Sequence, residues 1–76
     1  MRIEWSPAAI RSARRHAEDQ DGMQAIGTAV AHLADDPYPA DAFHRGEYHR
    51  LRVGPYRVAY MVDADVITIS RVERIV

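Results

Sequence analysis

The stretch HRLRVGPYRVAYMV, residues 49 to 62, decides the fold. Apolar and polar side chains alternate on both sides of Gly54-Pro55, which is the pattern of two strands joined by a tight turn. Because side chains alternate with a period of two, a two-residue turn places Arg52 opposite Arg57. The stretch therefore predicts an antiparallel hairpin that carries arginines on one face.

A third strand follows the hairpin. If Asp63-Ala64-Asp65 is a three-residue turn, Val62 lies opposite Val66 and Arg57 lies opposite Arg71. The arginines 52, 57 and 71 then form one row on an open face. The other face is apolar and is expected to meet the helices; it carries Leu51, Val53, Tyr56, Val58, Tyr60, Val62, Val66 and Val72.

The preceding half of the chain predicts one strand and two helices. Ser6-Pro7 is a helix start, so a short edge strand over 1–5 leads into a helix over 7–17 that buries Ile10, Ala13 and Ala17. A second amphipathic helix follows from apolar residues spaced by three and four, namely Met23, Ile26, Val30 and Leu33. A loop is expected over 37–46, and strands over 47–53, 56–62 and 66–72.

These elements predict one α+β domain over residues 1–76. The order is β-α-α-β-β-β, with a two-helix hairpin packed on one face of an antiparallel four-stranded sheet. The 76 residues include no cysteine, 47% are apolar and the net charge is −1. No membrane span, signal pattern, metal-ligand spacing or phosphate loop is present, so we expect a soluble, cytoplasmic protein without cofactor or metal.

The small net charge hides a division of the chain. All ten basic residues are arginines, and residues 18–41 carry acids but no arginine, whereas residues 44–60 carry four arginines against Glu47 alone. Like charges opposite each other cost roughly 0.2–1 kcal/mol per cross-strand pair, so an arginine row favours a polyanionic partner. The alternative is a solvated face on which arginines pair with acids such as Glu47 and Glu73.

Other side chains extend this hypothesis. Tyr48 shares the face of Arg50 and Arg52 and could stack on a base, as aromatic residues do in recognition of single-stranded RNA. His44 and His49 lie near the basic residues. By its parity with Leu51, His49 is expected to pack on the helix side of the sheet.

The segment YHRLRVGPYRVAYMVDADVITISRV, residues 48–72, resembles the hallmark segment of the RelE/ParE toxin superfamily, and the two preceding helices match as well. Members resembling RelE are ribosome-dependent mRNA endonucleases held inactive by an antitoxin. The resemblance implies catalytic roles for Arg57, at the scissile phosphate, and for Arg50 and Arg52, on the RNA backbone. It further implies RNA binding by Arg45, Tyr48, Arg71 and Arg74. The implied partners are a cognate antitoxin, mRNA in the ribosomal A site and, for the toxin–antitoxin complex, operator DNA.

The end of the sequence departs from the family pattern. Members often continue with a basic turn and a tail ending in tyrosine, but here the chain reads RVERIV over residues 71–76. Arg74 is the substitute for one basic position, and Glu73 stands where glycine is usual. Endonuclease activity is therefore left open against two alternatives, a non-enzymatic gyrase inhibitor of the ParE type and an inactive member retained for antitoxin binding and operator regulation.

Overall fold

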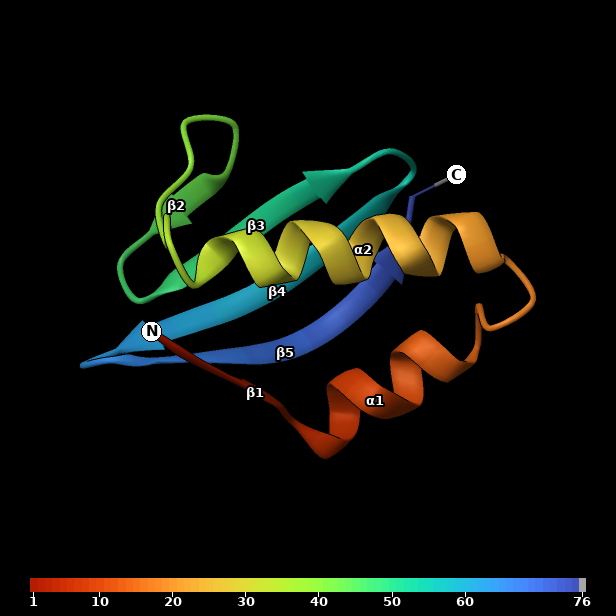
Figure 1. The fold of residues 1–76 in the computed structure, drawn as a ribbon, viewed down its shortest axis with the longest axis horizontal. Coiled ribbons are helices and arrows are strands. Elements are labelled where there is room, and N and C mark those ends of the chain that lie inside the picture. Colours follow the sequence, from red (N-terminus) through yellow and green to blue (C-terminus); the bar gives the residue numbers. More distant parts are fainter. Residues whose placement is uncertain (76) are drawn as a thin grey trace.

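The computed structural model describes residues 1–75, in which both helices cover the same face of one sheet (Figure 1). The helices are α1 (Pro7–Arg14) and α2 (Gln20–Leu33). The strands are β1 (Arg2–Trp5), β2 (Phe43–Arg45), β3 (Tyr48–Val53), β4 (Tyr56–Asp63) and β5 (Val66–Arg74). None of the helices in this part of the chain is both long and apolar enough to cross a membrane.

The predicted α+β class is confirmed, while the sheet is larger and mixed. Its order is β1-β5-β4-β3-β2, so residues 1–75 form five strands rather than four, and β1 runs parallel to β5 rather than antiparallel. The additional strand, β2, lies inside the predicted loop 37–46. It forms because Gly46, with a φ of 61°, is the first residue of a two-residue turn that places Arg45 opposite Tyr48.

The register of the central hairpin is as predicted, and that of the next hairpin is not. Arg52 lies opposite Arg57 across β3 and β4. Between β4 and β5 the turn has two residues, because Ala64 adopts a left-handed φ of 54°, and Asp63 faces Val66. A β-bulge near Ala59 then shifts the pairing again.

Helix α1 ends three residues earlier than expected and presents a different face to the sheet. Ile10 is 40% exposed, whereas Ala9 and Ser12 are buried. The Ser12 hydroxyl accepts the Val72 backbone N–H at 2.9 Å and donates to the Ala9 carbonyl at 3.0 Å. Small residues at this contact let α1 approach β5 closely, and the hydroxyl satisfies a buried donor just beyond the bulge.

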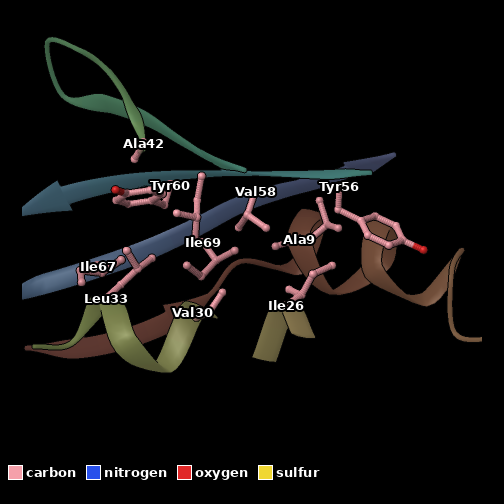
Figure 2. Packing of buried hydrophobic residues seen from close by; sticks show 12 residues of the cluster. Ala9, Ile26, Val30, Leu33, Ala42, Tyr56, Val58, Tyr60, Ile67 and Ile69 are labelled. Carbon is pink, nitrogen blue, oxygen red and sulfur yellow. The ribbon is translucent and has the colours of Figure 1, made fainter. Parts of the chain in front are cut away.

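The core fills the space between the sheet and the helices (Figure 2). Tyr56, Val58 and Tyr60 of β4 point toward the helices together with Ile67 and Ile69 of β5. From the opposite side Ile26, Val30 and Leu33 of α2 close the layer, as their helical spacing predicts. The other face of the sheet carries no helix among residues 1–75 and is open to solvent (Figure 1).

Candidate nucleic-acid interface

Four arginines gather on the open face of the sheet. β3 alternates between exposed and buried positions, and its exposed positions include Arg50 and Arg52. Arg57 of β4 lies opposite Arg52, and Arg45 of β2 lies opposite Tyr48, which is also exposed. We call Arg45, Arg50, Arg52 and Arg57 the arginine face. Sequence parity therefore placed Arg50, Arg52 and Arg57 on the correct face, whereas Arg45 belongs to a strand inside the predicted loop.

Within residues 1–75 no carboxylate lies at ion-pair distance from a guanidinium of the arginine face. The ion pairs in this part of the chain join Arg2 to Glu4, Arg71 to Glu73 and Arg74 to Asp19. Uncompensated guanidiniums side by side raise the local positive potential and lower the cost of bringing in a phosphate. The hypothesis of a face neutralised by local acids therefore applies to Arg71 alone.

Arg57 is the most constrained member of the arginine face. Its Nη1 donates hydrogen bonds to the carbonyl oxygens of Gly54, at 3.0 Å, and Tyr56, at 2.8 Å. Both acceptors belong to the turn and the first residue of β4, so the tight turn holds the guanidinium in place. A fixed cation on a rigid strand can stabilise charge that develops on a phosphate oxygen with little reorganisation.

Arg71 shares the open face but does not face Arg57. Arg71 lies opposite Ala59, and the residue across from Arg57 is Glu73. The Glu73 carboxylate is 3.0 Å from Nε of Arg71. The predicted row of arginines 52, 57 and 71 is thus wrong in register. A carboxylate takes the third position, with Arg71 beside it on the same strand.

Arg74 lies on the other side of the sheet. It pairs with Tyr56, whose side chain is fully buried toward the helices, and its guanidinium lies 5.6 Å from the centre of the Tyr56 ring. Its Nη1 is 3.9 Å from Asp19. The structure therefore separates Arg74 from the other predicted RNA-binding residues.

Asp19 joins the start of α2 to the start of β4. Its carboxylate accepts the Tyr56 hydroxyl at 2.6 Å and the Gly22 backbone N–H at 3.0 Å. The Tyr56 hydrogen bond is the main reason why the pKa of Asp19 is lowered, and the same bond raises the pKa of Tyr56. This contact fixes β4 immediately before Arg57, so it positions the arginine face from behind the sheet.

Two exposed aromatic side chains border the arginine face. Tyr48 is 66% exposed and Phe43 is 58% exposed. Phe43 lies opposite Arg50, whose guanidinium is 5.6 Å from the centre of the Phe43 ring. Phe43 was not among the predicted site residues, because its segment was expected to be a loop. The alternation in Phe43-His44-Arg45 before the glycine was the signal for a strand.

His44 and His49 form a pair whose side chains lie on the helix side of the sheet. Nδ1 of His44 and Nδ1 of His49 are 2.7 Å apart. His49 is buried, as predicted, and stacks on Tyr60 with 5.1 Å between ring centres. Burial, and secondarily the charge of His44, lower the pKa of His49. Within residues 1–75 no group of three or more His, Asp or Glu side chains is placed to hold a metal ion.

Similarity to solved structures confirms the fold. The toxin–antitoxin complex RelBE2 from Mycobacterium tuberculosis contains a chain with a TM-score of 0.78 and 19% identity, covering 96% of this chain and 95% of that one. YafQ from E. coli strain BL21(DE3) has a TM-score of 0.75 and 17% identity, covering 97% of this chain and 93% of the other. No curated protein sequence matches.

The fold, with its two helices behind an open basic sheet, is that of the RelE/ParE toxin superfamily. The family model described as "ParE toxin of type II toxin-antitoxin system, parDE" matches residues 3–74. Since this match spans nearly the whole sequence, the chain belongs to that family and is a toxin of a type II toxin–antitoxin system.

Proposed function

We propose that this toxin is an endoribonuclease that cleaves mRNA, with the message in the ribosomal A site and the arginine face as the RNA-binding surface. The observation that carries the proposal is the set of four arginines on one open sheet face, without ion pairs among residues 1–75 and bordered by two exposed aromatic residues. Guanidiniums bind phosphate in a planar, bidentate manner, and aromatic rings stack on unpaired bases.

Arg57 is the residue to which we assign charge stabilisation. In RNA cleavage the 2′-hydroxyl attacks the adjacent phosphorus, the new bond forms to the 2′-oxygen, and the bond to the 5′-oxygen breaks. Negative charge rises on the non-bridging oxygens, where the fixed guanidinium of Arg57 can donate hydrogen bonds. Arg50 and Arg52, on the neighbouring strand, would hold the flanking backbone and align the 2′-oxygen.

Glu73 is the carboxylate best placed to accept the proton of the 2′-hydroxyl. Arginine remains protonated at neutral pH and is a poor general base. Glu73 lies directly across from Arg57, and Arg71 holds its carboxylate at 3.0 Å. The residue that departs from the family pattern would thus supply the proton acceptor, while the leaving 5′-oxygen takes its proton from water.

Primer extension on a message translated in a cell-free system tests the proposal. The wild-type chain should block translation and produce defined cleavage ends. Arg57→Ala should lower the cleavage rate on saturating ribosome-bound message about 10²–10³-fold, the usual cost of losing one donor to an oxyanion. Arg14→Ala removes an exposed arginine of α1 away from the sheet face and should cleave like the wild type. An unchanged rate for Arg57→Ala would contradict the assigned role.

A cognate antitoxin is the proposed protein partner, and operator DNA the proposed ligand of the complex of both. The similar M. tuberculosis chain belongs to a toxin–antitoxin complex, and the family description names a toxin–antitoxin system. Co-expression with the product of the neighbouring reading frame should yield one complex in size-exclusion chromatography. Arg57→Ala should be retained in it, because its side chain bonds only to the turn among the contacts described.

Inhibition of DNA gyrase without catalysis is the second candidate. It is favoured by the match to a ParE family model and by the position of His49, whose side chain is buried against Tyr60 on the helix side of the sheet. A supercoiling assay distinguishes the candidates. If the chain inhibits gyrase and leaves the message intact, gyrase inhibition replaces endonuclease activity as the proposed function. If the chain neither inhibits gyrase nor cleaves the message, it is a member that only binds its antitoxin.

A further inference from the structure

A hollow lies at the β2 end of the arginine face. Its volume is about 410 Å³, and it is lined by Phe43, Arg45, Tyr48, His49, Arg50 and Ala59. This volume is at the lower end of the range of about 300–1,000 Å³ that is usual for ligand pockets. The hollow exists because the residue opposite Arg50 on β4 is Ala59, whose small side chain leaves room between its larger neighbours.

The residues that line the hollow define the chemistry of its occupant. Phe43 and Tyr48 expose their rings by 58% and 66%, so both can gain by stacking on a flat apolar group. Arg50 already places its guanidinium 5.6 Å from the Phe43 ring centre, and Arg45 lies opposite Tyr48. No carboxylate lines the hollow. The expected occupant is therefore flat, aromatic and attached to negative charge. A nucleobase with its phosphates has these properties.

We propose that this hollow, which we call the base slot, binds one unstacked base of single-stranded RNA, with Arg45 and Arg50 on the adjoining phosphates. The proposal rests on the proposed action on RNA and adds a subsite distinct from the phosphate position at Arg57. Ala59 and Arg57 are two residues apart on β4, roughly 7 Å along the strand. One short strand of RNA can therefore engage the base slot and Arg57 together.

Binding of a non-cleavable oligonucleotide tests the base slot independently of catalysis. The probes are 2′-O-methyl RNAs of about eight nucleotides, within the site sizes usual for single-strand binding. They form a series in which each position in turn lacks its base. Fluorescence anisotropy gives the dissociation constants. For the wild type, removal of the base at one position should weaken binding about 5–100-fold, as expected for loss of one aromatic stacking contact.

Substitutions in the slot complete the test. Phe43→Leu and Tyr48→Leu should weaken binding of the complete oligonucleotide to a similar extent, and should leave binding of the oligonucleotide abasic at the critical position unchanged. Phe43→Tyr and Tyr48→Phe keep the rings and should bind like the wild type. Arg45→Ala should weaken the binding of both probes, because it removes a phosphate contact.

The outcomes that overturn the base slot are distinct from those that overturn the endonuclease. The base slot would be refuted if Phe43→Leu weakened the binding of the complete and the abasic probe equally, or if it weakened the binding of neither. It would also fall if Phe43→Leu lost antitoxin binding and kept RNA binding, since the hollow would then belong to the antitoxin. Cleavage that depends on Arg57 would stand in each of these cases. Slot-dependent binding without any cleavage of message would instead refute the endonuclease and leave the slot in place.

Discussion

Arg52 and Arg57 lie directly opposite each other across β3 and β4, an arrangement that costs folding stability. Like charges in a cross-strand pair are unfavourable by roughly 0.2–1 kcal/mol. We expect Arg52→Thr to raise the free energy of unfolding by about this amount at low salt, and to weaken RNA binding at the same time. Urea denaturation and anisotropy on the same preparations measure both effects.

Arg45→Thr is the matched control for the expected gain in folding stability and loss of RNA affinity in Arg52→Thr. Arg45 lies opposite Tyr48 and not opposite a cation, so its replacement should weaken RNA binding without a gain in stability. High salt should remove the difference in free energy of unfolding between Arg52→Thr and the wild type, because salt screens the repulsion between Arg52 and Arg57. A loss of stability in Arg52→Thr at low salt would show that Arg52 makes a stabilising contact that outweighs the repulsion.

His49 predicts a dependence of stability on pH. Its pKa in the folded chain is lowered, by burial and then by the charge of His44, from an ordinary value of 6.5. The unfolded chain therefore binds the proton more readily, so stability is complete above the ordinary pKa and decreases as the pH falls below it. A proton on each facing Nδ1 would also break the His44–His49 contact of 2.7 Å.

Urea denaturation at about pH 7.5 and about pH 5, on either side of the ordinary histidine pKa, measures this effect. The wild type should lose stability between the two values, and His49→Phe should lose less. His32→Gln changes an exposed histidine of α2 and serves as the control with a wild-type profile. Equal pH dependence in His49→Phe and the wild type would show that burial of this imidazole is not linked to folding.

The two glycines of α2 lie in opposite environments. A β-carbon added to Gly22 would lie 2.6 Å from Cε2 of Tyr56 and closer still to Oδ2 of Asp19, whereas one added to Gly27 would have no neighbour within 4 Å. Alanine is better than glycine in a helix by about 1 kcal/mol, and forced overpacking costs typically about 1–3 kcal/mol. Gly27→Ala should therefore stabilise the chain by up to about 1 kcal/mol.

Gly22→Ala should destabilise the chain by roughly 1–2 kcal/mol, because the clash outweighs the gain in helix propensity. Asp19 and Tyr56 must separate to admit the methyl group, so the hydrogen bond of 2.6 Å between them is lost. Thermal unfolding of both variants gives the comparison. If both alanines were stabilising to the same extent, the contact between α2 and β4 would be looser than described.

The hairpin of β4 and β5 shows how far strand register follows from sequence. Arg52 facing Arg57 was predictable because a glycine and a proline fix the turn between them. The next turn contains Ala64 in a left-handed conformation. Alanine rarely adopts this conformation, so the residue type does not predict a two-residue turn here. The sequence does contain a signal for the bulge. Ile67 and Ile69 are buried at alternate positions of β5, but the buried Val72 is out of phase with them.

The helices and the candidate site were predictable to different extents. The spacing of apolar residues identified the buried face of α2, whereas α1 contacts β5 through Ala9 and Ser12 and leaves Ile10 exposed. Hydrophobicity alone favours the wrong face here, since close packing with a serine hydrogen bond decides it. Strand parity located Arg50, Arg52 and Arg57, but the strand that carries Phe43 and Arg45 was missed because short edge strands have weak signals.

The charges of the two central segments of the sequence lie mainly on different parts of the molecule. Three acids of the segment 18–41, namely Asp35, Asp36 and Asp41, line a space of about 390 Å³ between the end of α2 and β3, which Arg52 also lines. The arginines of the following segment lie on the open face of the sheet. A near-neutral chain thus presents a strongly polar surface, with a direction of approach for a polyanion.

This separation predicts how RNA binding depends on salt. Each phosphate neutralised on a single strand contributes about −0.7 to the slope of log affinity against log salt concentration, so the four arginines of the face imply a slope near about −3. Arg45→Ala should make the slope less steep by about 0.7. Arg14→Ala, on α1, should leave it unchanged. A slope near zero for the wild type would show that phosphate contacts are not the basis of binding.

The position of β5 links the fold to the order of protein synthesis. The last described strand in chain order, β5, is an inner strand of the sheet, paired with β1 on one side and with β4 on the other. Until β5 is made, β1 has no partner strand and the Ser12 hydroxyl has no Val72 amide to accept. A nascent chain that lacks this strand cannot complete its core, so the arginine face is assembled only once β5 has been made.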